Sequence, residues 1–181
     1  MNNIQTKRHG LSKSRLLLHR QCPKRLWLKV YHPELEEIDN GNQARFATGT
    51  YVGEVAQQLY PDGVLIDGDD LGQAMIDTKE ILTGEKRPIF EATFQSDGLL
   101  IRADLLLPDR DGFRMVEVKS STSVKDYHLT DAAIQSWVAE QAKLPLTSVE
   151  IAHIDNSFVY PGGGDYHGLF HHADISEQIS G

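Results

Sequence analysis

The sequence predicts a mixed α/β fold, in which helices flank a central mixed sheet. Apolar residues spaced three and four apart indicate amphipathic helices before residue 85 and again after residue 130. Between them, residues 88–119 hold three consecutive β-type runs separated by turn signals. A further β-type run at 149–154 follows the late helix. Helices on either side of this meander would cover the two faces of one sheet.

The N-terminal part is predicted to be helical. The Ser12 hydroxyl suits the N-cap of a helix from Lys13 to about His19, because it can accept a backbone N–H that has no partner at a helix start. Pro23 suits the first turn of a second helix. Residues 34–42, rich in acidic and turn-forming residues, are predicted to form a loop.

A longer amphipathic helix is predicted next, over residues 43–59, because Pro61 follows it as a stop signal. A short strand at 64–66 leads to another helix, from Leu71 to about Gly84. The apolar positions of the first of these helices fit one face, namely Val52, Val55, Ala56 and Leu59.

Residues 99–121 predict a β-hairpin whose loop of about four residues follows Pro108. With that loop, Pro108 pairs with Phe113 and Asp104 lies directly opposite Glu117. A slip of one residue would turn Asp104 onto the apolar face of the hairpin, which burial disfavours.

Side chains alternate along a strand, so Glu117 and Lys119 share one face of the hairpin. The same register puts Arg102 opposite Lys119. The buried face is expected to combine four apolar residues: Ala103, Leu105, Val116 and Val118.

The facing carboxylates of Asp104 and Glu117 indicate a metal site. Two carboxylates opposite each other repel, and a divalent cation between them relieves the repulsion, since hard cations such as Mg²⁺ prefer oxygen ligands. The alternative is a solvated charge lattice, in which Lys119 neutralises Asp104 and Arg102 neutralises Glu117 without any metal.

The C-terminal part predicts one more helix and further strands. Thr130 suits the N-cap of a helix over residues 131–143. Strands are predicted at 149–154 and 158–160, followed by a glycine-rich turn. The buried stripe of the helix is expected to be Ile134, Trp137, Val138 and Ala142.

Length and composition bound the class of protein. At 181 residues, of which 40% are hydrophobic and 24% charged, residues 1–181 are expected to form one soluble globular domain. No apolar run approaches 18 residues and no signal peptide is recognisable, so no membrane partner is expected. The single cysteine, Cys22, excludes an intramolecular disulfide and favours a cytoplasmic location. The last helical pattern, from Asp174, is short, so the domain is expected to be the N-terminal part of a longer protein.

The charge distribution favours a nucleic-acid partner although the net charge is −8. Residues 1–33 carry eight Lys or Arg and no acid, which gives this segment +8 and the remainder −16. The alternative is that this basic segment docks onto the acidic body. The residues expected to contact nucleic-acid phosphates are Lys24, Arg25, Lys29 and Ser121.

Asp104, followed after twelve residues by Glu117-Val118-Lys119, resembles the signature of the PD-(D/E)XK nuclease superfamily. The residues around it, Ile101–Asp104 and Glu117–Ser121, are similar to its RecB-like branch, and Cys22–Trp27 is similar to a motif of RecB-like and CRISPR-adaptation exonucleases. The resemblance spans roughly residues 11–155. It implies a restriction-endonuclease-like αβββαβ core and a metal-dependent deoxyribonuclease, with DNA favoured over RNA.

The resemblance also implies a role for each site residue. Asp104 and Glu117 would bind Mg²⁺ or Mn²⁺, with the Val118 carbonyl as a further ligand. Lys119 would orient the attacking water or stabilise developing negative charge. Gln135 would position that water or a phosphate.

Three positions depart from the family pattern. Many relatives have histidine where Gly53 stands, so Glu54 becomes the candidate further metal ligand on its helix. Ala139 stands where relatives often have tyrosine. Cys22 is the only cysteine, and an iron–sulfur cluster needs four, so no cluster is expected.

The competing functional hypothesis is a catalytically silent nucleic-acid-binding or docking module with the nuclease fold. The intact Asp104, Glu117 and Lys119 favour an enzyme. Other suggestive residues have plainer explanations. The histidines His167, His171 and His172 lack the spacing of a zinc site, and the run at 162–164 fits a turn better than a phosphate-binding loop.

Overall fold

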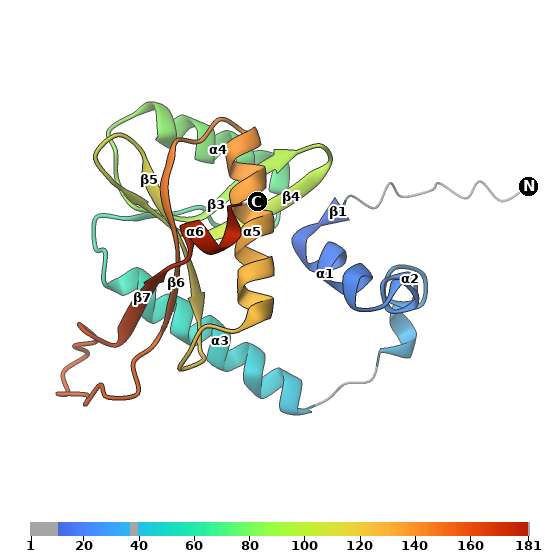
Figure 1. Cartoon of the computed structure of the whole chain (residues 1–181), viewed down its shortest axis with the longest axis horizontal. Helices are drawn as coiled ribbons and strands as arrows, with labels where there is room; N and C mark the ends of the chain where they lie inside the picture. The colour runs from blue at the N-terminus through green and yellow to red at the C-terminus, as the bar shows by residue number, and fades with distance from the viewer. Residues whose placement is uncertain (1–10, 37–39, 181) are drawn as a thin grey trace, which may run out of the picture.

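The structure, a computed structural model, describes residues 11–36 and 40–180 (Figure 1). Lys7 and Arg8 of the basic segment, and residues 37–39 of the expected loop, lie outside the described residues. The elements are β1 (Leu11–Ser12), α1 (Lys13–Gln21), α2 (Pro23–Tyr31), the 3₁₀ turn η1 (Pro33–Leu35), α3 (Asn40–Gln58), β2 (Val64–Leu65), α4 (Leu71–Thr83), β3 (Ile89–Ser96), β4 (Leu99–Pro108), β5 (Phe113–Lys119), α5 (Asp126–Gln141), β6 (Leu146–Ile154), β7 (Phe170–Asp174) and α6 (Ser176–Ile179).

The strands of the described residues form one mixed seven-stranded sheet, in the order β2-β3-β4-β5-β6-β7, with β1 paired to β4. The meander β3-β4-β5 is antiparallel. Helix α5 then crosses over so that β6 runs parallel to β5, and β7 returns antiparallel. The expected α/β class with helices flanking a mixed sheet is confirmed.

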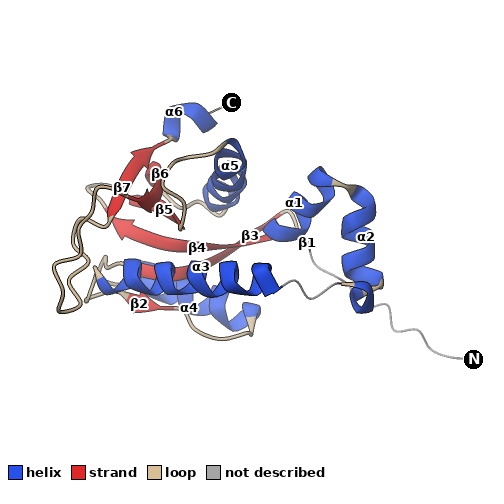
Figure 2. Cartoon of the chain, turned by 90° about the horizontal axis from the view of Figure 1, so that it is seen from below, coloured by secondary structure: helices blue, strands red, loops and turns tan. Residues whose placement is uncertain are grey.

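Helices cover both faces of the sheet. Figure 2 shows α5 and α6 on one side and α3 and α4 on the other. A larger apolar cluster that includes Met115, Val138 and Ile151 forms the main core. A smaller cluster joins Ala56 of α3 to Leu105 and Val116 of the sheet.

Helices α1 and α2 stand beside the sheet rather than on it (Figures 1 and 2). Ser12 caps α1 as expected, accepting the backbone N–H of Arg15 at 3.4 Å, and Pro23 begins α2. Neither helix contributes a buried residue. The two helices, which we call the N-terminal arm (residues 11–31, including β1), are therefore held by few contacts with the body.

Helix α5 differs most from its prediction. It begins at Asp126, five residues earlier than expected, and its N-cap is Lys125, so Thr130 lies inside the helix. Trp137, expected in the buried stripe, is 42% exposed. The face that α5 turns to the sheet instead contains polar side chains, among them His128, Asp131, Gln135 and Ser136.

The segment after β6 also differs. Residues 158–160, expected to form a strand, have no regular structure, and β7 forms later, at Phe170–Asp174. Ser157 and Asp155 form a turn in which the Asp155 carboxylate accepts the backbone N–H of Ser157 at 2.8 Å. That local bonding competes with a strand ladder, so the chain leaves the sheet there.

Candidate active site

The hairpin has the predicted register at its closed end. Pro108 pairs with Phe113, and the pairing continues to Leu105 with Val116. Gly112 is required in the turn, because a Cβ there would lie 2.2 Å from the Pro145 carbonyl oxygen. The register therefore aligns Asp104 with Glu117, at the point where the β4–β5 ladder ends.

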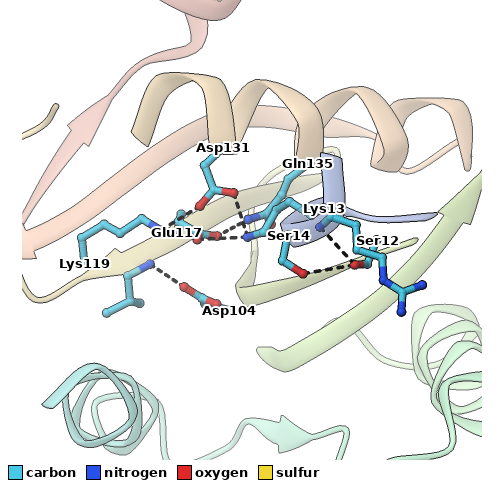
Figure 3. Close-up of polar contacts among 10 residues, drawn as sticks. Ser12, Lys13, Ser14, Asp104, Glu117, Lys119, Asp131 and Gln135 are labelled. Atoms are coloured by element: carbon cyan, nitrogen blue, oxygen red, sulfur yellow. Dashed lines mark hydrogen bonds and ion pairs between the residues drawn. The ribbon is translucent and has the colours of Figure 1, made fainter. Parts of the chain in front are cut away.

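The two strands separate at Asp104. Its carboxylate Oδ2 accepts the backbone N–H of Val118 at 2.8 Å, so a side chain takes the place that a strand carbonyl would hold. Asp104 is thereby fixed beside β5 with its carboxylate in the opening between the strands (Figure 3).

The alternation of β4 breaks at the same place, which corrects two expectations. Ala103 packs in the larger core cluster and Leu105 in the smaller one, although they are two residues apart. Arg102 does not face Lys119: it donates to the Ile66 carbonyl at 2.8 Å and lies 3.4 Å from Glu91. The neighbouring strand shows the cause, because Glu91 has a φ of 57°, a left-handed conformation that interrupts the pleat.

Glu117 and Lys119 share one face of β5, as predicted, and meet α5. Lys119 Nζ lies 2.6 Å from Glu117 Oε1 and 2.8 Å from Asp131 Oδ2. Asp131 projects from the polar face of α5 (Figure 3). The ammonium thus joins the strand to the helix.

A second lysine reaches the same carboxylates from the N-terminal arm. Lys13, the first residue of α1, has its Nζ 3.2 Å from Glu117 Oε1 and 3.0 Å from Asp131 Oδ1. The side chains of Lys13 and Lys119 are each 21% exposed, whereas those of Glu117 and Asp131 are 6% and 9% exposed. Two ammonium groups therefore bracket two buried carboxylates.

Gln135, one turn after Asp131 on α5, completes the cluster. Its amide nitrogen donates to Glu117 Oε2. The opposite orientation of the amide would set two acceptor oxygens against each other, so the donor must face Glu117. The Gln135 carbonyl oxygen is buried and has no hydrogen-bond partner among the described residues.

Burial and neighbouring charge shift the pKa values of the site. Burial and the charge of Glu117 raise the pKa of Asp104 well above its ordinary value. Burial opposes ionisation of Asp131, but Lys13 and Lys119 outweigh it and lower its pKa to about 2. Burial likewise opposes the charge on Lys119, but Glu117 and Asp131 raise its pKa. Lys119 is therefore a stable cation. At Asp104, in contrast, burial and the charge of Glu117 outweigh the opposing charges of Lys13 and Lys119.

The donor set suits a hydrated divalent cation. The carboxylates of Asp104 and Glu117 come from strands that separate between them, and burial together with the charge of Glu117 raises the pKa of Asp104, an effect that a nearby cation would oppose. Among the side chains of the described residues, no three His, Cys, Asp or Glu side chains come together as a metal cage. Mg²⁺ is commonly held by one or two carboxylates and keeps several waters, which this pair allows.

Glu54, expected as a further metal ligand, does not join this set. It is exposed on α3 and lines a shallow hollow with Gln57, Tyr60 and Phe90. The expectation is therefore not met. The apolar stripe of α3 faces the smaller core cluster, whereas Glu117 and Lys119 lie on the sheet face toward α5.

The other predicted residues lie outside the cluster or touch it through the backbone. Val118 contributes its N–H to Asp104. The Ser121 hydroxyl donates to the Ser123 carbonyl at 2.9 Å. The basic residues expected to contact nucleic acid are exposed on α2, namely Lys24, Arg25 and Lys29. Arg25 donates a hydrogen bond to Gln21, and Lys29 pairs with Glu36 at 2.6 Å.

Sequence reasoning missed Lys13 and Asp131. Asp131 stands one turn before Gln135 on the polar edge of a helix, and that spacing was a signal that both would face the same partner. Lys13 gave no such signal among the basic residues of the arm, because 104 positions separate it from Glu117.

The comparisons with known proteins assign no family. Neither the models of known protein families nor the curated proteins include a match to this chain. In the part of the chain that the structure describes, no helix combines the length and apolar character needed to cross a membrane.

Proposed function

We propose that this protein is a metal-dependent nuclease that hydrolyses phosphodiester bonds, with DNA the favoured substrate, on a restriction-endonuclease-like αβββαβ core. The observation that carries the proposal is the meeting of Asp104, Glu117 and Lys119 where β4 and β5 separate. The element order supports it: apart from β2 and α4, which lie between α3 and β3, the elements from α3 to β6 follow the αβββαβ order that this core implies.

The residues of the cluster suit the chemistry of phosphodiester hydrolysis. A divalent cation held by Asp104 and Glu117 would lower the pKa of a bound water and bind a phosphate oxygen. Lys119, kept protonated by its two acidic neighbours, would stabilise negative charge on the reacting phosphate. Gln135 fixes Glu117 through its N–H and offers its free carbonyl oxygen to a water.

The exposed side chains of α2 support a nucleic-acid partner. Lys24 and Arg25 are exposed there, and the rings of Trp27 and Tyr31 are 50% and 62% exposed. The two rings lie 5.7 Å apart. Cations beside exposed aromatic rings suit phosphates and unstacked bases.

A cleavage assay tests the proposal. Linear single-stranded, linear double-stranded and circular DNA would each be incubated with the protein in Mn²⁺, in Mg²⁺ and in a chelator. We expect metal-dependent loss of at least one substrate, abolished by Asp104→Asn and by Glu117→Gln. Exposed Asp97, at the β3–β4 turn, provides the matched control Asp97→Asn, which should retain activity. Cleavage by both site variants would contradict the proposal.

A silent nucleic-acid-binding module is the second candidate function. One observation favours it: the carboxylates of Glu117 and Asp131 are already neutralised by Lys13 and Lys119. Such a module would bind DNA equally with metal and with chelator and would leave every substrate intact. The same assay, combined with a binding measurement, separates the two functions.

A further inference from the structure

Lys13 lies where an incoming cation would have to go. Its ammonium contacts Glu117 and Asp131, and its charge also interacts with Asp104 and Glu91. The three carboxylates of the site, together with Glu91 of β3, therefore act on one group from the N-terminal arm. In Figure 3, Lys13 enters the cluster from the side opposite Lys119.

Glu117 has no carboxylate oxygen free of protein partners. Oε1 lies near both lysine ammonium groups, and Oε2 accepts from Gln135. A Mg²⁺ ion binds its oxygen ligands at about 2.0–2.1 Å, and an ammonium on the same oxygen would repel it. A metal ion that binds Oε1 must therefore displace one of the two ammonium groups, whereas Gln135 occupies only one of the two lone pairs of Oε2.

Lys13 is the partner that can withdraw most easily. Lys119 is part of β5, in the middle of the sheet, and Gln135 is buried on α5. The arm that carries Lys13 is attached through a two-residue pairing of β1 with β4. Leu16 of α1 packs against the main core only as a partly buried residue. Segments with so few buried contacts open at low free-energy cost.

We propose that the N-terminal arm is a latch, in which Lys13 holds the carboxylates of the metal-free site and is displaced, together with α1, when a divalent cation binds. This inference rests on the proposed metal-dependent function. In the metal-free protein, Lys13 reduces the repulsion between buried acids. A bound cation would take over that role, so that Lys13 and α1 would move away from α5 and open the site to a nucleic-acid strand.

Calorimetric titration with Mn²⁺ tests the competition. Lys13→Met should bind Mn²⁺ at least tenfold more tightly than the unmodified protein, because no ammonium has to be displaced. Lys79→Met is the matched control: it removes the same charge from an exposed site on α4 and should change the affinity less than twofold. Lys13→Arg keeps the charge and should bind no more tightly than the unmodified protein. Equal or weaker binding by Lys13→Met would overturn the latch.

The fluorescence of Trp137 tests the movement of α1. Leu16 and Arg20 of α1 line a groove of about 570 Å³ together with Trp137 of α5. In a Trp27→Phe background, which leaves Trp137 as the one tryptophan, saturating Mg²⁺ should shift its emission to the red as the groove opens. Lys13→Met should show part of that shift without metal. An emission spectrum that does not change on saturation would overturn the displacement of α1.

Failure of the latch and failure of the proposed function give different results. If the unmodified protein binds Mn²⁺ and cleaves DNA, but Lys13→Met binds no more tightly, the latch alone is wrong. If neither protein binds Mn²⁺ and no DNA is cleaved, the metal-dependent function is wrong, and the latch with it.

Discussion

The backbone N–H of Val118 donates to Asp104 Oδ2 at 2.8 Å, across the point where β4 and β5 part. The acceptor in this hydrogen bond is a side-chain carboxylate, whereas in a regular strand ladder it would be a backbone carbonyl. The bond therefore ends the pairing of the strands and fixes the Asp104 carboxylate beside Glu117.

The raised pKa of Asp104 predicts a pH-dependent stability. An acid with a higher pKa in the folded than in the unfolded state favours folding below its unfolded value, here 3.8. That contribution is lost as the pH rises through the folded pKa. The free energy of unfolding of the metal-free protein, measured with urea from pH 4 to 8, should therefore fall over this range more steeply than that of Asp104→Asn. Asp97→Asn is the control and should keep the slope of the unmodified protein. Equal slopes for all three proteins would refute the prediction.

The lowered pKa of Asp131 predicts a pH dependence of stability with the opposite sign. Its folded pKa of about 2 lies below the ordinary 3.8, which corresponds to about 2 kcal/mol of stability that is present above pH 4 and lost as the pH falls through 2. Asp131→Asn should lower the free energy of unfolding by about that amount at pH 7, and the difference should shrink in acid. Asp126→Asn, on the exposed first turn of α5, should cost no more than about 1 kcal/mol. A difference that is independent of pH would count against the ion pairs.

Lys119→Ala should keep metal binding and lose nuclease activity. The ammonium is proposed to act on the reacting phosphate, so its removal should lower turnover by about 10²–10³-fold. Mn²⁺ titration and single-turnover cleavage measure the two effects separately. Lys125→Ala removes an exposed lysine at the start of α5 and serves as the control. Full activity of Lys119→Ala would leave the charge cluster with a structural role alone.

The contact between Gln135 and Glu117 predicts energetic coupling. Gln135→Leu leaves the buried Oε2 of Glu117 without its donor, which should cost about 1–3 kcal/mol of unfolding free energy. In a double-mutant cycle with Glu117→Gln, the two losses should be less than additive, because both variants break the same bond. Strict additivity would show that the amide and the carboxylate do not interact in solution.

The exposed cations of α2 predict the salt dependence of DNA binding. Each phosphate contact contributes about one unit to the slope of log affinity against log salt. In an Asp104→Asn background, which prevents cleavage, replacing Lys24 and Arg25 by glutamine should reduce that slope by about two units. Lys79→Gln removes an exposed lysine from α4 and should leave the slope within half a unit of that background. If the double variant keeps the full slope, α2 does not contact the phosphate backbone.

The chain sequence by itself determined the local elements and the hairpin register. Ser12 and Pro23 set the starts of α1 and α2 through interactions within one turn: the Ser12 hydroxyl accepts a backbone N–H, and Pro23 occupies the first position of α2. The tight turn ending at Gly112 fixed the pairing of Pro108 with Phe113, and that pairing aligned Asp104 with Glu117. These features depend on residues close together in the chain, so their signals are local.

Only the tertiary structure decided which charged groups meet. The left-handed backbone at Glu91 reverses the alternation of the neighbouring strands and turns Arg102 away from Lys119. The polar face of α5 is buried because Asp131 and Gln135 find partners on β5, which a pattern of apolar residues cannot reveal. Lys13 joins Glu117 through the pairing of β1 with β4. Contacts of this kind arise from the packing of distant segments, and the periodicity of helices or strands does not indicate them.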